Sequence, residues 1–483
     1  MISINHFPRI THPPSAQTNR EVITDMEADF PTWEPGIRRN YPTLRGERQA
    51  DVLIVGGGLT GATCAALLTM QGARVVLLEA HRLGMGDSFA CTGKVTSQLA
   101  GVYTTVAKTV GMDAASAYAR LMREAVLGVR ALCDSFHLPC QPREQDVYVF
   151  AETEDDRSDL QTLSDVEAKL GIPAAPAPDA GGCPFPVELS LHTPHQLTLS
   201  PLPYLLGLIE AAEAQGCEVY EQSPVRAIDG RRASTPGGSV EAAWIVLATG
   251  SPIGCTSLPR LAMMQQRACA SVVLQGGAPL HASHLSVQPD EMTRRPIPGG
   301  ALLAWDMGRA GTRQHEARQT ILERTLKALL PEYRVQERIL RQDVWSGDGL
   351  PLIGSIRPEA SHLLMAAGYS GWGVANAYLA ARIITGQIMG RPLPEASLFR
   401  PDRRYPGHAG VMLREGVNVA GGYLSSLLRP GAPVCTHMSG RLRYNLDAGR
   451  WECPCHGSAF TVMGETLTGP AMGNAKVSAH QRQ

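Results

Sequence analysis

A glycine-rich turn between two short apolar runs constrains the fold of this chain more than any other feature. Residues 56–61 read GGGLTG and fit the pattern G-x-G-x-x-G. The run ADVLIV at 50–55 precedes the turn, helical apolar spacing follows over 59–71, and the run ARVVLL covers 73–78. A strand, a glycine-rich turn, a helix and a second strand within about thirty residues predict a βαβ unit that binds a dinucleotide.

Each glycine of the turn has a separate physical role. Gly56 permits the tight turn, Gly58 lets a pyrophosphate approach the backbone, and Gly61 lets the helix pack close to the sheet. Leu59 and Thr60 open the helix, whose unpaired N–H groups and positive dipole end face the phosphates. We therefore expect these five residues to contact the cofactor.

Glu79 ends the second predicted strand and selects among dinucleotides. A carboxylate there accepts hydrogen bonds from ribose hydroxyls and repels a 2′-phosphate, which favours FAD or NAD over NADP. No second G-x-G-x-x-G opens a helix in this sequence. Flavin reductases fed by NAD(P)H usually need such a second site, so electrons are expected to enter from an organic substrate.

Composition excludes several classes of partner and location. The 483 residues carry 44 basic and 45 acidic side chains, so the net charge of −1 gives no reason to expect nucleic acid or an anionic membrane. No apolar run of about eighteen residues predicts a transmembrane helix. The N-terminus lacks the apolar region of a secretory signal, and a cytoplasmic location is expected.

Three of the eleven cysteines lie close together near the C-terminus. Cys435-Thr-His437 is followed by Cys453-Pro-Cys-His456, a set of two cysteines and two histidines with metal-ligand spacing. Such a set binds zinc in many proteins and iron–sulfur clusters in others, and the spacing alone leaves both open. The other eight cysteines are scattered, as buried small side chains of a cytosolic protein would be.

The remaining pattern predicts further elements and domain limits. Residues 1–49 are expected to form an extended leader with Trp33 as an anchor, and a domain boundary is expected near 395–405. Beyond Arg400 the chain is expected to form short strands and turns. Helices are predicted over 112–137, 201–215, 314–330 and 373–389, and a strand over 243–248.

Five separated motifs, in order, resemble the D-amino-acid oxidase/glycine oxidase superfamily of FAD enzymes over residues 45–395. Besides the glycine-rich turn, they are HRLGMGDSFACTGKVTSQLAG after Glu79, SPL at 200–202, ATG at 248–250, and the pair WSGDGLPLIG and AAGYSGWG at 345–354 and 366–373. The CPCHGS segment at 453–458 resembles the second loop of Rieske proteins. Bacterial proteins that pair these two domains form a recognisable group.

The resemblance implies an α/β fold in which a Rossmann-like FAD-binding domain is interleaved with a β-rich substrate domain. The FAD-dependent oxidoreductase would cover 50–400, with FAD-binding parts at about 50–137, 201–257 and 345–395 and a substrate domain at about 138–200 and 258–344. A small all-β Rieske [2Fe–2S] domain would cover 401–483. Further residues implied along the FAD are Ser88, Thr92, Gly93, Val225, Thr249, Gly250, Gly349, Gly368, Gly371, Trp372 and Gly373.

For the iron–sulfur centre the resemblance implies Cys435 and Cys453 on one iron and His437 and His456 on the other. The sequence departs from high-potential Rieske proteins at Gly440, where those proteins carry a second cysteine of the first loop. A free thiol is therefore expected at the middle cysteine of CPC. Few residues between about 405 and 434 look like the strands that usually precede the first loop, so an abbreviated domain is expected.

The leading functional hypothesis is a dehydrogenase or oxidase of an amine or amino acid. Electrons would pass from FAD to the Rieske cluster and on to an external one-electron carrier or O2. Two alternatives stay open: a redox partner could feed electrons inward for a reductive or O2-activating step, or the chain could be a non-catalytic redox sensor. No side chain is assigned as a catalytic base.

Several polar residues are not promoted to a site. His192 and His195, and likewise His281 and His284, have H-x-x-H spacing without a convincing carboxylate ligand for a mononuclear iron. The pair 294–295, two arginines, fits a carboxylate clamp, but a solvated surface pair is the favoured interpretation. Lys94 is placed equally well near the flavin or in water.

Overall fold

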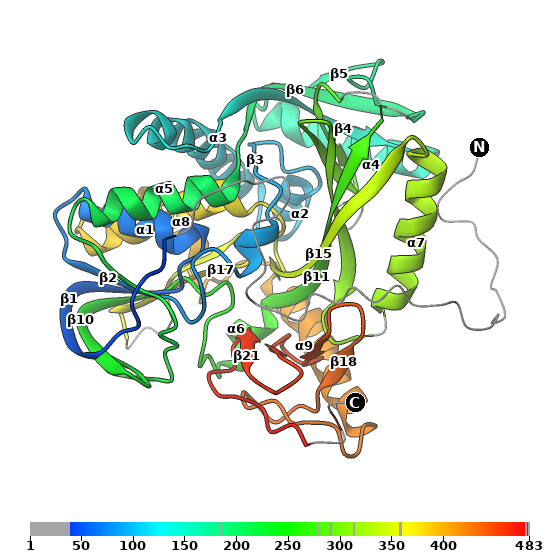
Figure 1. The fold of residues 1–483 in the computed structure, drawn as a ribbon. Coiled ribbons are helices and arrows are strands. Elements are labelled where there is room, and N and C mark those ends of the chain that lie inside the picture. The colour runs from blue at the N-terminus through cyan, green and yellow to red at the C-terminus, as the bar shows by residue number, and fades with distance from the viewer. Residues whose placement is uncertain are drawn as a thin grey trace.

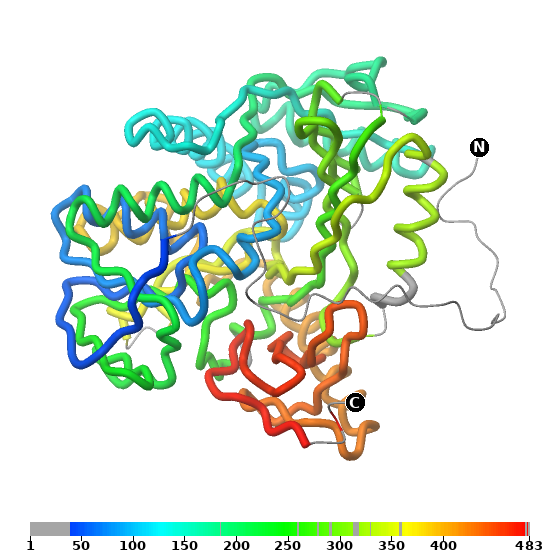
Figure 2. The backbone as a smooth tube through the Cα atoms, in the orientation of Figure 1, coloured from blue at the N-terminus to red at the C-terminus, as the bar shows by residue number. Residues whose placement is uncertain are grey.

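The structure is a computed structural model that describes residues 39–183, 185–277, 280–288, 292–312, 314–356, 360–478 and 481. Three bodies are visible in Figure 1: a parallel sheet under helices, a larger antiparallel sheet beside it, and a small C-terminal part below both. Figure 2 traces how the chain passes back and forth between the first two bodies before it enters the third. The predicted interleaving of two domains is confirmed.

The first sheet is built around the strand that precedes the glycine-rich turn. β1 pairs in parallel with β10 on one side and with β2 on the other, and its residues 52–55 are almost completely buried. Parallel strands covered on both faces need such continuous apolar runs. The strand order is β16 (Leu352–Ser355), β17 (Leu363–Ala367), β10 (Gly238–Leu247), β1 (Gly46–Val55), β2 (Val75–Leu78), β7 (Glu218–Tyr220). β9 (Arg232–Thr235) also pairs with β10, and β8 (Ala227–Asp229) pairs with β9.

Three helices lie together over one face of this sheet, as Figure 1 shows. They are α1 (Leu59–Thr69), α5 (Pro201–Glu213) and α8 (Gly373–Ile388), and α1 packs against both of the others. The long α3 (Met112–Ser135) contacts α8 from further out. The predicted helices over 59–71, 112–137, 201–215, 314–330 and 373–389 are therefore present, each ending one or two residues earlier than expected.

The second sheet has nine strands and is mostly antiparallel. Its order is β15 (Tyr333–Ser346), β11 (Met264–Gly276), β14 (Gly300–Arg309), β13 (Thr293–Ile297), β12 (Ser283–Ser286), β4 (Arg143–Ala151), β6 (Leu189–Thr198), β3 (Lys94–Val95), with β5 (Ala175–Pro176) on β6. The other elements before the C-terminal part are the helices α2 (Val102–Thr109), α4 (Glu154–Lys169), α6 (Leu258–Ala262) and α7 (Gln314–Leu329) and the 3-10 turns η1 (Asp87–Ala90) and η2 (Pro394–Phe399). Of these, η2 packs on β16 of the first sheet.

The C-terminal part corrects one expectation. A four-stranded antiparallel sheet is present, made of β18 (Arg443–Asn445), β19 (Arg450–Glu452), β20 (Ala459–Phe460) and β21 (Thr466–Thr468). However, α9 (His408–Leu427) fills the stretch for which short strands and turns were expected. Its four glycines and two prolines just upstream look like a loop in sequence, but apolar residues at intervals of three and four support the helix.

The N-terminal limit also differs from the expectation. β1 begins at Gly46, because residues 46–50 pair with β10, so the last predicted leader residues belong to a strand. Trp33, the expected anchor, lies outside the described residues. Among the helices of the described ranges, none has the length and apolarity needed to cross a bilayer.

Candidate flavin and iron–sulfur sites

The glycine-rich turn has the close contacts that its sequence pattern requires. Gly56 has φ +109°, and a Cβ built there would lie 2.5 Å from the carbonyl oxygen of Ala248, which follows the neighbouring strand β10. A Cβ on Gly61 would lie 1.9 Å from the Gly56 carbonyl oxygen. Because α1 presses directly on the turn, its first N–H groups point to the edge of the sheet where a dinucleotide pyrophosphate binds.

Glu79 and Ser88 tie the turn to the next two segments of the chain. Glu79 Oε2 accepts a hydrogen bond from the Gly57 backbone N–H at 2.7 Å, and its Oε1 accepts one from His81 at 2.8 Å. The Leu59 N–H donates to Ser88 Oγ at 3.1 Å. The structure thus brings these two predicted residues together with the turn, beside the start of α1.

Three further residues implied along the FAD lie next to β10 or in the apolar core behind β1 and β2. Gly250 follows β10 with φ +70°, and a Cβ there would lie 3.4 Å from Asp87 Oδ2. Thr249 Oγ1 donates to the Ser251 carbonyl oxygen at 2.6 Å. Val225 is buried in the apolar cluster behind β1 and β2.

A second glycine-rich loop leads into α8. Gly368, Ser370 and Gly371 all have positive φ, and the helix begins at Gly373 with Trp372 at its N-cap position. The Tyr369 and Thr60 hydroxyls are hydrogen-bonded at 2.9 Å, which joins this loop to α1. The N-termini of α1 and α8 therefore lie close together. Neither helix has a capping hydrogen bond from its N-cap side chain.

Gly349 packs against α2. It has φ +86°, and a Cβ there would meet Val106 of α2 at 2.9 Å. It does not line the pocket described below, and neither does Gly368, whose Cβ would face Ser346. Both glycines permit tight packing behind the cavity wall.

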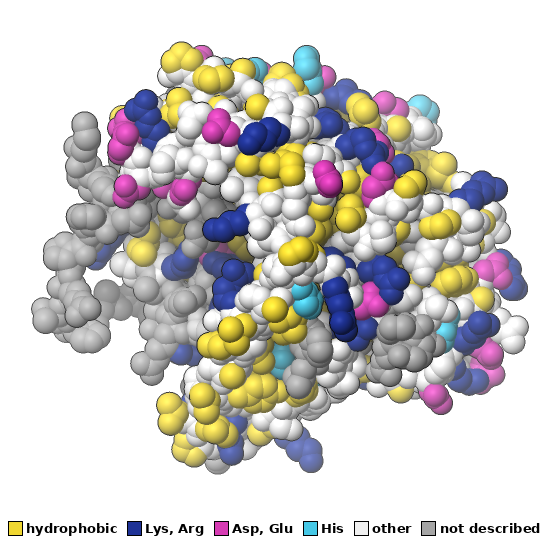
Figure 3. All heavy atoms as spheres, turned by 180° about the vertical axis from the view of Figure 1, so that it is seen from behind, with side chains coloured by type: hydrophobic (Ala, Val, Ile, Leu, Met, Phe, Trp, Pro, Cys, Tyr) yellow, Lys and Arg dark blue, Asp and Glu magenta, His cyan; other side chains and the backbone are white. Residues whose placement is uncertain are grey.

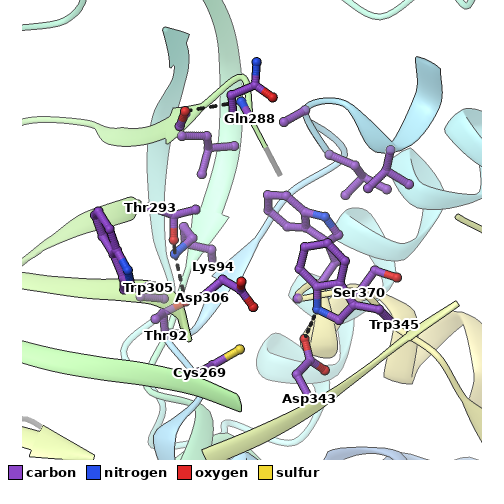
Figure 4. Close-up of a pocket in the computed structure, with 18 of the residues that line it drawn as sticks. Thr92, Lys94, Cys269, Gln288, Thr293, Trp305, Asp306, Asp343, Trp345 and Ser370 are labelled. Carbon is purple, nitrogen blue, oxygen red and sulfur yellow. Dashed lines mark hydrogen bonds between the residues drawn. The ribbon is translucent and has the colours of Figure 1, made fainter. Parts of the chain in front are cut away.

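A pocket with a cavity volume of about 70 Å³ lies where the two sheets meet. Figure 4 shows Trp305 and Cys269 on one side and Trp345 and Ser370 on the other, with a space between them. The predicted residues Thr92, Gly371 and Trp372 line this pocket. Gly93 has φ +69°, and a Cβ there would lie 2.0 Å from the Leu199 carbonyl oxygen, so the backbone next to Thr92 is held tightly.

Lys94 lines the pocket and is buried, so the water-facing alternative is excluded. Its ammonium donates to Thr92 Oγ1 at 2.8 Å and to Thr293 Oγ1 at 3.0 Å. An ammonium has three donors, so one remains for a pocket occupant. Burial, and secondarily the charge of Arg295, lowers the pKa of Lys94 to about 7.

Sequence reasoning missed the polar residues that β15 contributes to the pocket. Arg341, Asp343 and Trp345 alternate along the strand, so all three point to one face and line the cavity. The Trp345 indole N–H donates to Asp343 Oδ2 at 3.2 Å. Burial raises the pKa of Asp343. The alternation of these three residues is visible in the sequence. It indicates a binding site only when the strand is known to border the cavity.

Asp87 is a further buried carboxyl that sequence reasoning missed. Its Oδ1 accepts a hydrogen bond from the Gln342 N–H at 3.2 Å, so η1 is held against β15. Burial, followed by the nearby Asp343 carboxylate, raises the pKa of Asp87 to about 6. This carboxyl therefore lies between the predicted dinucleotide edge at Gly250 and the strand that lines the pocket.

The two C-terminal loops bring the four predicted metal ligands together. The rings of His437 and His456 have centroids 5.2 Å apart, and the Cys435 and Cys453 thiols interact through a hydrogen bond. Within the described ranges, no three His, Cys, Asp or Glu side chains are grouped as ligands of a single metal ion. A Rieske cluster takes two thiolates on one iron and two imidazoles on the other, and the cysteine pair and the histidine pair seen here fit that ligand set.

The surroundings of these ligands also fit a cluster. His456 Nε2 is buried without a hydrogen-bond partner among the described residues, and burial lowers the pKa of this imidazole to about 4. A metal ligand needs that neutral form. A Cβ on Gly440 would lie 2.7 Å from the Cys455 Sγ, and Cys455 forms no disulfide, as expected from the sequence.

The C-terminal part is docked on the flavin side through its cluster loops. The His437 Nε2 lies 2.6 Å from the Cys255 carbonyl oxygen, in the loop that follows Thr249-Gly250. The Gly254 N–H donates to the Pro470 carbonyl oxygen at 2.9 Å, and the Gly311 N–H donates to Glu452 Oε2 at 2.9 Å. The loop after β10 and the turn after β14 therefore complete the environment of the short iron–sulfur part.

Three of the four histidines with H-x-x-H spacing are held by contacts within the fold. His192 and His195 both lie on β6 and bind Asp146 and Glu144 at 2.8 and 2.6 Å. His284 is buried, with Nε2 3.0 Å from the Ala180 carbonyl oxygen. His281 lies just before β12 and outside the pocket lining.

The expectation of a solvated pair at Arg294 and Arg295 is wrong. Both side chains are buried, at 1% and 7% exposure. Arg294 lies over the Phe185 ring and donates to the Cys183 Sγ at 2.8 Å. Consecutive residues on a strand face opposite sides, but both sides of β13 are covered by other parts of the chain.

A Rossmann-type sheet with a glycine-rich turn, a pocket at the junction with an antiparallel sheet and an attached mixed Cys/His centre define a flavin-dependent oxidoreductase with an iron–sulfur domain. The model of the family "FAD dependent oxidoreductase" (DAO) matches residues 51–387, and that of the "Rieske [2Fe-2S] domain" matches 428–479. The chain belongs to the FAD dependent oxidoreductase family, and FAD and a [2Fe–2S] cluster are its cofactors.

The chain is similar to several known proteins. The "Putative Rieske 2Fe-2S iron-sulfur protein YhfW" of Bacillus subtilis (strain 168) is 27% identical over 90% of this chain and 94% of its own length. Gamma-glutamylputrescine oxidoreductase of Escherichia coli (strain K12) is 27% identical over 46% of this chain and 54% of that protein. Glycine oxidase from Geobacillus kaustophilus superposes with a TM-score of 0.63 at 20% identity, covering 74% of this chain and 99% of that one.

Proposed function

We propose that this chain oxidises an amine or amino-acid-like substrate and passes the electrons through its own iron–sulfur domain to an external acceptor. FAD supplies two-electron chemistry when bound, and a Rieske cluster supplies one-electron exchange. The observation that carries the proposal is the contact between His437 and the Cys255 carbonyl oxygen. A predicted cluster ligand rests directly on the loop that follows the predicted FAD residues Thr249 and Gly250.

The pocket supports a substrate with both a carboxylate and an amine. Arg341 lines it as a guanidinium that binds carboxylates in a fixed, planar geometry. Asp343 lies two residues further on the same face and offers a carboxyl group, while Trp345, Trp372 and Trp305 supply apolar walls. The names of glycine oxidase and gamma-glutamylputrescine oxidoreductase, both of which specify amino compounds, support this substrate class.

Lys94 is the residue that we assign to proton uptake from the substrate ammonium. With a pKa of about 7 it is divided between amine and ammonium near neutral pH. Thr92 and Thr293 hold its Nζ at the pocket wall, and the remaining position on nitrogen faces the cavity. A neutral substrate amine is the form that can give up hydride, so a nearby proton acceptor favours the reaction.

Anaerobic stopped-flow absorption with glycine, L-proline and gamma-glutamylputrescine tests the proposal. Bleaching of the flavin bands by one of these amines, in the absence of any other reductant, is the expected result. If none bleaches the flavin while a reduced ferredoxin does so through the cluster, electrons flow inward and the alternative of a reductase gains support. The Arg341→Lys variant is expected to weaken binding of amines that carry a carboxylate.

Benzylamine provides the matched probe for that variant, because it has an amine but no carboxylate. Its rate constant for flavin reduction is expected to change little in Arg341→Lys. Equal losses for both kinds of amine would contradict the carboxylate role of Arg341.

A further inference from the structure

Helix α9 has an inner face that supports the iron–sulfur loops. Gly422 packs so closely on the second loop that a Cβ there would lie 2.5 Å from the Pro454 carbonyl oxygen. The Tyr423 hydroxyl donates to the Met438 carbonyl oxygen at 3.1 Å, and its ring lies 5.9 Å from that of His456. This face of the helix is therefore fully explained by contacts within the chain.

The outer face of α9 is apolar and exposed to solvent. Figure 3 shows hydrophobic side chains gathered over the lower part of the molecule, where α9 lies. The side chains of this surface, here called the α9 stripe, are 62–82% exposed apart from the small Ala420, which is also exposed. The stripe consists of Leu413, Val417, Ala420, Leu424, Leu427 and Leu428.

The spacing of the stripe is that of a helix which packs against another helix. From Leu413 to Leu427 its members follow at intervals of four, three, four and three residues, the repeat of a coiled-coil seam. A solvated helix normally places charged and polar residues on its outer face. Arg414, at the edge of the stripe, is the nearest charged side chain in α9 that is exposed.

Three glycines beside the stripe independently indicate that another polypeptide packs closely against α9. A Cβ built on Gly410, Gly416 or Gly421 would meet no atom within 4 Å, and none of the three has a positive φ. The fold of a single chain therefore does not require them, although each costs about 1 kcal/mol relative to alanine inside a helix. Glycines of this kind let another backbone approach closely.

The stripe is complementary to itself when it is turned end for end. A two-fold axis between Ala420 and Gly421 places Leu413 opposite Leu428 of a second copy, Val417 opposite Leu424, and Leu427 opposite Arg414 at the edge of the stripe. Small residues then meet at the centre, and the same patch serves both copies, as a two-fold interface requires. The two Arg414 side chains would lie roughly 20 Å apart along the axis, beyond a Debye length at physiological salt.

We propose that α9 pairs with α9 of a second copy of this chain, in antiparallel orientation, to form a homodimer. A second copy is favoured over an anionic membrane because the stripe lacks the lysines and aromatic residues of interfacial helices. Twenty residues span about 30 Å, so a strip one helix wide covers roughly 300–350 Å² per copy. That is well below the ~800 Å² per partner of stable complexes, so a weak, concentration-dependent dimer is expected.

Sedimentation velocity of the holoprotein tests the proposal. The protein concentration is varied from about 1 to 200 µM, a range that brackets the dissociation constant expected of a weak dimer. The wild-type chain is expected to pass from monomer to dimer over this range. Leu424→Glu is expected to raise the dissociation constant on the order of 100-fold, since one leucine leaves the interface in each copy. Leu446→Glu, which changes a leucine that is 76% exposed outside α9, is the matched control and should dimerise normally.

Gly421→Ile adds a second, independent readout. It should weaken the dimer because a large side chain keeps the two helices apart, whereas the open space above Gly421 in one chain predicts no loss of thermal stability of the monomer. Flavin and cluster absorbance report that each variant is folded.

Three results would overturn the proposal. They are a wild-type chain that stays monomeric at every concentration, a Leu424→Glu variant that still dimerises, and stripe-dependent binding to phosphatidylglycerol vesicles by the monomer. If the chain stays monomeric, residues 1–38 become the next segment to test for binding to the stripe. The last assigns the stripe to a membrane surface.

Discussion

At the residue scale, the buried amino group of Lys94 links the pocket to the pH dependence of stability. Its pKa is about 7 in the folded chain against 10.5 for an ordinary lysine, so the unfolded chain binds more protons between these values. Stability is therefore lost as the pH falls from about 10.5 to 7, and the loss is complete below 7.

Lys94→Met is expected to raise the melting temperature at pH 6 and to have no such effect near pH 10.5. The gain in the free energy of unfolding at pH 6 is a few kcal/mol at most, because one pKa unit corresponds to about 1.4 kcal/mol. Differential scanning fluorimetry across this range measures it. Lys108→Met, at an exposed lysine, is the matched control, and its melting temperature should differ from that of wild type by the same amount at every pH. If the difference between Lys94→Met and wild type also stays constant with pH, the assigned pKa of Lys94 is wrong.

The cysteines of the CPC segment provide a second test at this scale. Cys453→Ser removes a predicted ligand, so we expect loss of the iron content and of the electron paramagnetic resonance (EPR) signal of the reduced cluster. Cys455→Ser alters a thiol two residues away that is not a predicted ligand, and it should retain both. Retention of the cluster in Cys453→Ser, or its loss only in Cys455→Ser, would show that the ligands are assigned wrongly.

Residue roles were predictable from sequence only where a motif has a fixed local geometry. Gly56, Gly61 and Glu79 act within one βαβ unit, so their spacing determines their contacts. Arg341 and Asp343 act across the cavity from Lys94, and no local pattern relates residues about 250 positions apart. The burial of Arg294 was missed for the same reason, because Cys183 and Phe185, which contact its side chain, lie about 110 positions earlier in the chain.

At the element scale, the packing of α1 on the glycine-rich turn decides whether the dinucleotide edge is formed. A Cβ at position 61 would lie 1.9 Å from the Gly56 carbonyl oxygen, so the helix must move away from the turn in Gly61→Ala. Such overpacking costs roughly 1–3 kcal/mol and displaces the N–H groups that face the phosphates.

We expect Gly61→Ala to be purified with much less FAD than wild type, as measured by the ratio of absorbance at the flavin and protein bands. Gly86→Ala is the control, since a Cβ there meets no atom within 4 Å and its φ is −75°. Normal FAD content in Gly61→Ala would mean that the turn does not bind the pyrophosphate.

The elements themselves were predicted well where apolar periodicity is strong and poorly where glycine interrupts it. The strands and helices around residues 50–78 follow from buried runs and a 3.6-residue period. Helix α9 was missed because its glycines resemble a loop, and α4 was missed because its first turn is highly acidic. That acidic turn is in fact favourable at a helix start, where Thr153 and Asp156 form a capping box.

At the scale of the whole molecule, the iron–sulfur domain and the flavin domain make one electron-transfer unit only if their docking is tight. Gly311 allows this, because a Cβ there would lie 2.7 Å from the backbone nitrogen of Pro454. No sequence pattern predicted the contact, since it depends on how two separately recognisable parts pack together.

Gly311→Ala is expected to slow reduction of the cluster without changing the rate at which an amine bleaches the flavin. Gly299→Ala is the matched control: both glycines have positive φ, +71° and +77°, but no atom lies within 4 Å of a Cβ at position 299. Stopped-flow absorption with rapid-freeze EPR separates the two steps. Equal cluster reduction in both variants would contradict the role of the docking contact.

The most direct test of the central claim is rapid-freeze EPR of the wild-type chain after anaerobic mixing with whichever amine bleaches its flavin. We expect the signal of a reduced Rieske cluster to follow flavin bleaching with no other reductant present, and Cys453→Ser to show bleaching without this signal. A wild-type chain whose flavin is bleached while its cluster stays oxidised would contradict the proposed electron path, because the two centres would then not exchange electrons.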